Sequence, residues 1–424
     1  MAENPAVPLD PIDEPIDVAT LTANELRAAH TLFGRALHRR PATDDGWPWT
    51  ERAYAPGRTF GVHVDGALAG TATSFPTRTA VPGGAALPTA AVTRVGVRAD
   101  RTRRGLLSAM MRHQLADAAA RGEVLATLRA SETRIYGRFG YGVASRGRTV
   151  RVRARGAGWR AGAPAGGTVR LLDPDEVVGT LAALHDRLAL RRPGGMTRPD
   201  GWWSVQLGRR LAEREHVQVA VHSGADGDDG FAVWTITESG TGFGQNTARV
   251  EDLHAADTGA VAGLWRFLLG LDLLVDVEGW LRPLDEPLEL LLADPRDCAT
   301  TAVADETWLR LVDVAAALDA RAYGAADPVL LAVHDAVLPS NGGLYRISPD
   351  GVARLDGDPD GGAPSHPEPH LECDVAALSM AYLGDRTPSE LAATGWWRVH
   401  DAAAPDRADA LFRTAGSPWC GTFF

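Results

Sequence analysis

An arginine-rich loop that leads into a helix is the stretch of this chain best suited to bind an anion. Residues 92–97 predict a strand, and Arg101, Arg103, Arg104 and Gly105 follow it at the start of an amphipathic stretch. The first turn of a helix has backbone N–H groups without partners and the positive end of the helix dipole. A glycine there lets the backbone approach a bulky anion. The spacing therefore indicates a pyrophosphate site. It differs from the Rossmann fingerprint, because only one glycine opens the helix, and a basic helix start without a ligand is the alternative.

A tyrosine follows the next predicted strand, residues 124–129. Two parallel strands that splay apart would open a slot beside the helix start. Tyr136 lies on the helical turn after the second strand and would face that slot, whereas Tyr141 lies between two glycines and is expected to pack. The alternative for either residue is a core tyrosine with a satisfied hydroxyl.

Composition excludes several enzyme classes. The 424-residue chain contains 43 basic residues, and every one is arginine. Schiff-base and pyridoxal enzymes, Walker-A phosphate loops and protein kinases all need a lysine at the reacting centre. The net charge of −11 argues against non-specific nucleic-acid binding. Residues 94–160 nevertheless hold 16 arginines and four acids, which suggests a bound anion there or, alternatively, a solvated basic surface.

The elements that must position these residues fall into three blocks. The first has a helix at 21–37 and strands at 60–73 and 87–97, and a linker follows at 156–167. The second repeats the strand-then-helix order, with strands at 218–221, 230–236 and 247–253 and a helix at 260–269 that Asp257 caps. The third begins near Trp308, with strands at 329–333 and 343–347, a loop at 356–362, and helices at 375–383 and 388–393. We therefore predict an α/β protein with a duplicated, diverged domain.

Other features bear on location and ligands. Three scattered cysteines are too few for a disulfide framework or a zinc site, so we expect no metal. The acidic, proline-rich start lacks a signal-peptide pattern, and no run of eighteen apolar residues predicts a membrane span. These features favour a cytoplasmic protein.

Several motifs together resemble the Eis family, the enhanced intracellular survival proteins of the GNAT N-acetyltransferase superfamily. They are the Arg-Arg-Gly-Leu-Leu helix start, the block Ala-Ser-Glu-x-x-Ile-Tyr-Gly-Arg-Phe-Gly-Tyr-Gly, the Pro193-Gly194-Gly195 stretch before Arg198, residues 264–272, and residues 308–323. The resemblance implies an α/β (α+β) architecture of two GNAT-type domains followed by a sterol-carrier-protein-like domain. We expect a catalytic domain at 1–155, a GNAT-like domain without a cofactor site at 168–307, and a C-terminal domain at 308–424. The resemblance also implies a homohexamer.

The family's mechanism is direct acetyl transfer from acetyl-CoA to an amine. Tyr136 would be the general acid, and the terminal carboxylate of Phe424 would be the base. A chain-end carboxylate has an ordinary pKa near 3.5, which makes it a weak base unless apolar neighbours raise that value. The donor would be held by Val95, Gly96, Val97, Arg103, Arg104, Gly105, Leu106, Leu107, Ser108, Ser131 and Glu132. The alternative for the chain end is docking for packing alone.

The expected acceptor is an aminoglycoside, a lysyl side chain or another polyamine-like molecule. The resemblance assigns its pocket to Phe33, Trp47, Trp49, Thr93 and Trp202, although ordinary core packing is the alternative for these aromatics. Arg35 and Phe423 stand where the family's mycobacterial relative has acids, so we expect weaker binding of such polycations. Two further hypotheses are a non-catalytic CoA or ligand sensor and an acyltransferase with another donor or acceptor.

Overall fold

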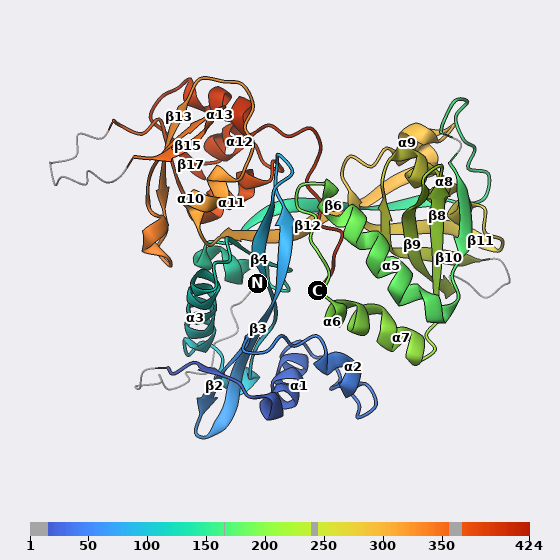
Figure 1. Ribbon diagram of the computed structural model, residues 1–424, viewed down its shortest axis with the longest axis horizontal. Coiled ribbons are helices and arrows are strands. Elements are labelled where there is room, and N and C mark those ends of the chain that lie inside the picture. The colour runs from blue at the N-terminus through green and yellow to red at the C-terminus, as the bar shows by residue number, and fades with distance from the viewer. Residues whose placement is uncertain (1–15, 165, 239–244, 356–366) are drawn as a thin grey trace, which may run out of the picture.

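The structure is a computed structural model that describes residues 16–164, 166–238, 245–355 and 367–424. The loop expected at 356–362 lies outside the described residues. The described chain forms two β-sheets: one of twelve strands, in the order β1-β2-β3-β4-β5-β12-β6-β11-β10-β9-β8-β7, and one of five, in the order β15-β14-β13-β16-β17. Figure 1 shows three lobes, with the C-terminus where they meet, beside α6 (Asp200–Trp203).

The first lobe holds one half of the large sheet. Its strands are β1 (Ala19–Thr20), β2 (Thr59–Val64), β3 (Ala67–Ala80), β4 (Ala86–Val97) and β5 (Leu125–Leu128). Its helices are α1 (Leu26–Ala36), α2 (Trp47–Glu51), α3 (Leu106–Ala120) and α4 (Thr133–Tyr136). A 3-10 turn at Ala23–Glu25 precedes α1, so the helix starts later than expected.

The prediction of one strand at 60–73 is wrong. Asp65 and Gly66 have φ angles of 53° and 73° and turn the chain back into the β2–β3 hairpin. Asp-Gly is a dipeptide that favours this two-residue turn, because both positions need a positive φ. The sequence therefore contained the signal for the turn.

Two long strands join the first and second lobes. β6 (Gly142–Arg153) pairs with β12 (Cys298–Leu311) and with β11 (Leu274–Pro283), and β12 also pairs with β5. Figure 1 shows both strands passing between the lobes. The sheet therefore continues across the expected boundary between residues 307 and 308.

The second lobe repeats the central unit of the first. β4 and β5 are parallel and are connected through α3, and β10 (Asn246–Ala255) and β11 are parallel and are connected through α8 (Thr258–Leu269). Asp257 caps α8 as expected, accepting the Ala260 N–H at 2.9 Å. The remaining elements are β7 (Thr168–Leu171), β8 (Val217–Gly224), β9 (Gly227–Glu238), α5 (Pro174–Leu188), α7 (Arg209–Ala212) and α9 (Leu288–Leu291).

The third lobe packs on the large sheet and then sends the chain back to it. Its strands are β13 (Val329–His334), β14 (Gly343–Ser348), β15 (Gly351–Arg354), β16 (Leu371–Asp374) and β17 (Trp397–Val399). Its helices are α10 (Val314–Asp319), α11 (Val375–Tyr382), α12 (Pro388–Ala393) and α13 (Ala404–Phe412). Its apolar core includes Leu309 and Leu311 of β12 and Leu125 of β5. Because this core is shared, the start of the tail (residues 413–424) is fixed relative to the first lobe.

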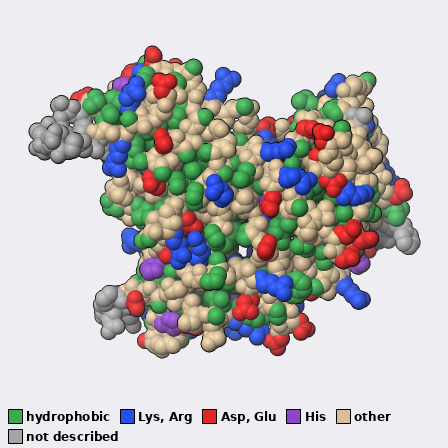
Figure 2. All heavy atoms as spheres, in the orientation of Figure 1, with side chains coloured by type: hydrophobic (Ala, Val, Ile, Leu, Met, Phe, Trp, Pro, Cys, Tyr) green, Lys and Arg blue, Asp and Glu red, His purple; other side chains and the backbone are tan. Residues whose placement is uncertain are grey.

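No helix in the described part of the chain is long and apolar enough to cross a bilayer. Figure 2 shows arginine and acidic side chains interspersed on one face of the molecule.

Candidate active site

A cleft of about 700 Å³ lies at the start of α3. It is lined by Val95, Gly96, Val97, Arg103, Gly105, Leu106, Leu107, Ser108, Ser131, Glu132 and Tyr136, together with residues 36–37, 101–102, 135 and 138. The structure thus brings every residue expected to hold the donor into one cleft, except Arg104.

A β-bulge in β4 opens this cleft. β4 and β5 stay paired only up to Val92 opposite Leu128, where β5 ends while β4 continues. On the other edge of β4, Thr73 lies opposite Thr93 but Thr71 lies opposite Gly96, so β4 contains an extra residue. Arg94, at this bulge, has a φ of 51°. A bulge bends its strand and leaves backbone groups outside the ladder, so residues 95–97 border the cleft instead of pairing with β5.

The start of α3 fits a pyrophosphate group. Gly105 is the N-cap, with a φ of 83°, and no side chain caps the helix. A Cβ at Gly105 would come within 3.3 Å of Ile16 Cδ1 and would be strained at this φ. Arg104 is half-buried beside the cleft, and its Nε is buried without a hydrogen-bond partner among the described residues. Uncapped N–H groups and nearby guanidiniums are the donor set that a diphosphate needs.

Tyr136 ends α4 on the wall of the cleft. Glu132 fixes the start of this short helix by accepting the Arg134 N–H at 3.3 Å. Tyr136 is 6% exposed, and burial raises its pKa to about 12, so its phenol holds its proton at neutral pH. Tyr141 packs edge-on against it, with ring centroids 6.1 Å apart, and is fully buried outside the cleft lining.

The tail returns to the large sheet and is clamped there by a buried ion pair. The Glu306 carboxylate on β12 accepts the backbone N–H groups of Cys420 at 3.0 Å and Gly421 at 2.8 Å. It also accepts the Ser145 hydroxyl at 2.8 Å and lies 3.3 Å from the Arg129 guanidinium. Arg129 in turn donates to the Thr422 carbonyl at 2.6 Å. One carboxylate therefore ties the tail to β6, to β12 and to the residue that follows β5.

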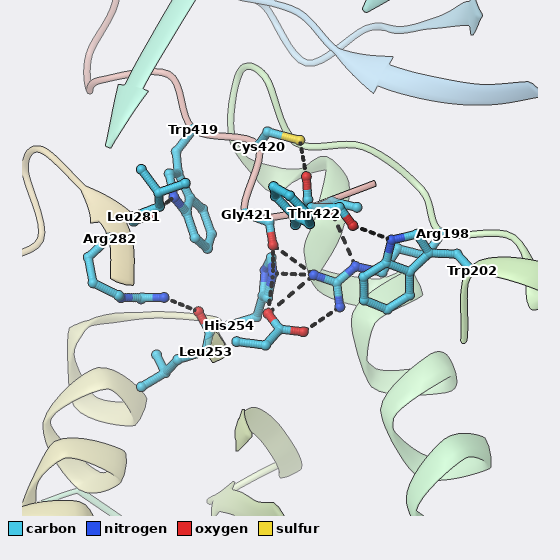
Figure 3. Close-up of polar contacts among 12 residues, drawn as sticks. Arg198, Trp202, Leu253, His254, Leu281, Arg282, Trp419, Cys420, Gly421 and Thr422 are labelled. Atoms are coloured by element: carbon cyan, nitrogen blue, oxygen red, sulfur yellow. Dashed lines mark hydrogen bonds and ion pairs between the residues drawn. The ribbon is translucent and has the colours of Figure 1, made fainter. Parts of the chain in front are cut away.

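The second lobe holds the tail from the other side, as Figure 3 shows. Arg198 donates to the Gly421 carbonyl at 2.8 Å and to the Thr422 hydroxyl at 3.0 Å, and it pairs with Asp252 at 2.6 Å. Burial opposes ionisation of Asp252, but Arg198 and then His254 keep its pKa below the ordinary range. Burial lowers the pKa of His254, whose ring packs against Trp419 at 4.8 Å.

These contact residues were not among the expected site residues. Arg198 stands within a motif that the resemblance used, but nothing in its spacing indicates contact with a tail more than two hundred residues away. Asp252 belongs to an acidic stretch of the second block. Glu306 lies on β12 and Arg129 directly follows β5, both without any motif, so no sequence signal marked them.

The last residue, Phe424, lines a pocket of about 190 Å³ next to the cleft at the start of α3. The pocket also contains Thr93 and Trp202, two of the residues expected around the acceptor. The Phe424 ring packs edge-on against Phe75 at 5.5 Å, and Trp202 donates to the Phe423 carbonyl at 2.7 Å. Thr93 and Arg94 line this pocket and residues 95–97 line the cleft at α3, so the two cavities adjoin along β4.

The other expected acceptor residues lie outside this pocket. Phe33 and Trp47 pack around His30, with ring centroids 6.2 and 5.9 Å from it. Trp49 lies against the second lobe in a separate groove with Ser204 and Gly208. We find no contact of these three side chains with the tail among the described residues.

The two departures from the family pattern also lie in different places. Arg35 lines a third groove, with Arg27 and Arg98, away from Phe424. Phe423 is 43% exposed and packs against Trp280 at 5.4 Å. Only the change at Phe423 therefore borders the pocket region at the chain end.

Among the described residues, no three His, Cys, Asp or Glu side chains are arranged to hold a metal ion.

Comparison with known proteins agrees with this architecture. Residues 17–144 and 194–311 each match an acetyltransferase (GNAT) domain, and residues 314–421 match a sterol carrier protein domain. The α/β class with two GNAT domains and a sterol-carrier-protein-like domain is thus confirmed.

Relatives cover nearly the whole chain. An uncharacterized N-acetyltransferase from Streptomyces avermitilis is 36% identical over 416 residues, covering 95% of this chain and 96% of that protein. The N-acetyltransferase Eis of Mycobacterium tuberculosis is 35% identical over 357 residues, covering 81% and 83%. The crystal structure of Eis1 from Mycobacterium abscessus has 37% identity and a TM-score of 0.85, covering 97% and 100%. A GCN5-related N-acetyltransferase from Kribbella flavida, 21% identical with a TM-score of 0.74 and coverage of 97% and 98%, shares the fold. This chain is therefore a member of the Eis family of GNAT N-acetyltransferases.

Proposed function

We propose that this N-acetyltransferase transfers acetyl from acetyl-CoA directly to a primary amine, between Tyr136 and the carboxylate of Phe424. The observation that carries the proposal is the meeting of two cavities along β4: one opens onto the start of α3 and contains Tyr136, and the other contains the chain end. Acetyl-CoA, when bound, supplies an activated acetyl thioester.

The donor site proposed here is the cleft at α3. Residues 95–97 would bind the pantetheine arm with backbone groups that β5 leaves unpaired, and Gly105 to Ser108 would bind the pyrophosphate through the first helical turn. Arg103 and Arg104 add positive charge beside that turn. Ser131 and Glu132 border the inner end of the cleft, next to Tyr136.

Tyr136 is proposed to give its proton to the departing sulfur. Its phenol stays neutral because burial raises its pKa to about 12, so the proton is present at every pH at which the enzyme would work. A well-placed acid of this kind contributes about 10²- to 10⁴-fold to a rate.

The terminal carboxylate of Phe424 is proposed to hold the amine and to accept its proton, directly or through a water molecule. Phe75 packs against the Phe424 ring and Trp202 lines the same pocket, and apolar neighbours of this kind favour a higher carboxyl pKa. This role needs a fixed tail, and the Glu306 and Arg198 contacts supply that fixation.

The proposal divides the chain as the sequence suggested. Residues 1–155 would bind the donor, residues 308–424 would supply the terminal carboxylate, and residues 168–307 would hold the tail without binding a cofactor. In the second lobe, the helix that corresponds to α3 is α8, and the Asp257 side chain already occupies its N-cap. A carboxylate at that place repels a pyrophosphate. We also propose a cytoplasmic homohexamer, which sedimentation analysis and cell fractionation would test.

The acceptors to test first are those of the family resemblance: aminoglycosides, lysyl side chains and other polyamine-like amines. The assay measures thiol release from acetyl-CoA with each amine. The decisive variant adds one glycine after Phe424, which moves the free carboxylate while keeping every side chain, and a glycine added before Met1 is the control.

We expect the C-terminal extension to abolish turnover without changing acetyl-CoA affinity. Full turnover in the extended protein would refute the role of the chain end. No thiol release with any amine, alongside tight CoA binding, would favour a sensor, and faster release from propionyl-CoA or malonyl-CoA would favour another acyl donor.

A further inference from the structure

The pocket at the chain end has an unusual charge for a site that accepts amines. Its lining includes two arginines, Arg52 and Arg94, and no aspartate or glutamate side chain. The remaining lining is mostly apolar or backbone: Ala53, Ala55, Phe75, Pro76, Thr93, Pro199, Gly201, Trp202, Val205, Gln206 and Phe424. Among the described residues of this lining, Phe424 alone can supply a negative charge, through its terminal carboxylate.

Arg94 is a guanidinium without a carboxylate partner. It stands at the β4 bulge, with its guanidinium carbon 4.8 Å from the centre of the Tyr54 ring. Within the described residues, its side chain forms no ion pair and no hydrogen bond. Burial lowers its pKa, and it in turn helps to lower the pKa of His30 to about 4, after the larger effect of burial. Burial also raises the pKa of Tyr54 to about 12, so Tyr54 and His30 are both neutral beside Arg94 at pH 7.

An unpaired cation in such surroundings favours an anion from outside. Removing a guanidinium from water is costly unless a counter-ion and hydrogen bonds compensate it. Arg52 adds a second guanidinium at the same pocket. It is exposed, lies 5.1 Å from the Trp49 ring centre, and has no ion pair among the described residues. Two arginine forks match a carboxylate or a phosphate geometrically.

Charge narrows the class of ligand further. The cavity of about 190 Å³ adjoins a second one of about 250 Å³ that shares Trp202 and Gln206 with it, so its volume sets no upper limit on the acceptor. The two arginines, however, would repel a molecule with many ammonium groups.

We infer that the acceptor of this enzyme is a small amine that also carries a carboxylate, as an apolar or aromatic α-amino acid does. The inference rests on the proposed function, because it places the amine beside the terminal carboxylate of Phe424. Arg94 and Arg52 bind the acceptor's carboxylate, while Phe75 and Trp202 contact its apolar side chain.

The groups already named account for each bond and each proton in the acetyl transfer. The amine nitrogen forms a bond to the acetyl carbon as the carbon–sulfur bond breaks. The amine gives up a proton to the terminal carboxylate, and the sulfur receives one from Tyr136. The products are the N-acetylated acceptor and the free CoA thiol.

The test compares molecules that differ only in the anion. Thiol release from acetyl-CoA is measured with L-phenylalanine, with 2-phenylethylamine, which lacks the carboxylate, and with 1-amino-2-phenylethylphosphonate, which replaces it. Kanamycin represents polycations. The variants are Arg94→Gln and, because Arg94 is half-buried against Tyr54 and its loss could disturb folding, the exposed Arg52→Gln. Arg151→Gln, an exposed arginine on β6, is the matched control. Calorimetric binding of L-phenylalanine to the CoA-bound protein is measured in parallel.

We expect kcat/KM for L-phenylalanine to exceed that for 2-phenylethylamine by about 10- to 100-fold, the usual effect of a charge-assisted pair of hydrogen bonds. Arg94→Gln should remove most of this preference, Arg52→Gln part of it, and Arg151→Gln none. Preference for the phosphonate over the carboxylate would assign the site to phosphorylated amines and overturn the amino-acid assignment.

Two other results would overturn the inference while leaving the proposed function intact. One is better turnover of kanamycin than of L-phenylalanine. The other is an equal loss for L-phenylalanine and 2-phenylethylamine in Arg94→Gln, which would mean that Arg94 pairs with the terminal carboxylate. Arg94-dependent binding of L-phenylalanine without thiol release would instead support the anion site and refute the proposed transfer.

Discussion

Replacing Glu306 with glutamine should separate tail docking from donor binding. The carboxylate presents two oxygens to four donors: one oxygen accepts from Cys420 N and the Ser145 hydroxyl, the other from Gly421 N and Arg129. Its side chain is fully buried, so water cannot replace a lost contact. An amide keeps the shape but has only one acceptor and no charge.

The loss in free energy of tail docking follows from those contacts. The amide nitrogen would face the Cys420 N–H, donor against donor, and the other hydrogen bonds would lose their charge. A buried bond left unmade costs about 1–3 kcal/mol, and charge-assisted bonds are roughly twice as strong as neutral ones. We therefore expect docking of the tail to weaken by about 3 kcal/mol, or about 100-fold in its equilibrium constant.

The assay measures kcat, acetyl-CoA affinity, and tryptic cleavage after the exposed Arg413, which removes residues 414–424 when the tail is free. Asp335→Asn is the matched control, because Asp335 is a buried carboxylate in the third lobe that also accepts two backbone N–H groups and pairs with an arginine. Both variants should lose thermal stability, but only Glu306→Gln should lose kcat and be cleaved faster. Equal cleavage and unchanged kcat in the two variants would refute the clamp.

Further predictions concern single groups. Tyr136→Phe should lower kcat by about 10²- to 10⁴-fold with unchanged acetyl-CoA affinity; weaker affinity in calorimetry would make the residue structural. Because Tyr136 has a pKa of about 12, kcat should show no loss from its ionisation below pH 10, whereas a basic limb near pH 8 that disappears in Tyr136→Phe would contradict its burial. Gly105→Val should weaken acetyl-CoA binding, since its φ of 83° does not suit a β-branched residue; unchanged affinity would remove this helix start from the donor site. Gly421→Ala should free the tail, because a Cβ there would collide with the Trp419 ring, and undiminished kcat would refute this. His254 has a folded pKa below its ordinary value, so its contribution to stability is complete above pH 6.5 and falls as the pH drops toward the folded value; tryptic cleavage of the tail should therefore accelerate between pH 7 and pH 5.

Local signals made much of the fold predictable. Helix α8 was expected from Asp257 and the apolar spacing after it, and α12 from Pro388 onward, because a cap and a periodic face act within a few residues. The β2–β3 hairpin was missed, although Asp65-Gly66 signals it, because apolar residues continue through the turn. The joining of the lobes by β6 and β12 was not predictable, because paired residues such as Leu309 and Gly142, 167 positions apart in the sequence, have no local signature.

The candidate site also contains parts that the sequence predicted and parts that it did not. The donor cleft was predictable because a strand, a loop and a helix start that follow one another in sequence also adjoin in space. The tail clamp was not, because Glu306, Arg129 and Arg198 come from three distant segments and differ in no local feature from other charged residues. The family resemblance implied where the chain end goes, but not which residues hold it.

The absence of lysine makes the partners of each arginine informative. Arginine has to perform every cationic role in this chain, so residue type alone does not distinguish a structural arginine from a binding one. The partners of an arginine make this distinction. The buried Arg310 pairs with Asp335, and Arg321 donates to the carbonyls of Tyr382 and Phe412. Such arginines are satisfied by the fold. Arg94 has no comparable partner among the described residues and stands where two cavities meet, so its charge is available to a ligand. Candidate acceptors should therefore be chosen for an anionic group that can pair with Arg94, rather than for contacts with the aromatic residues around it.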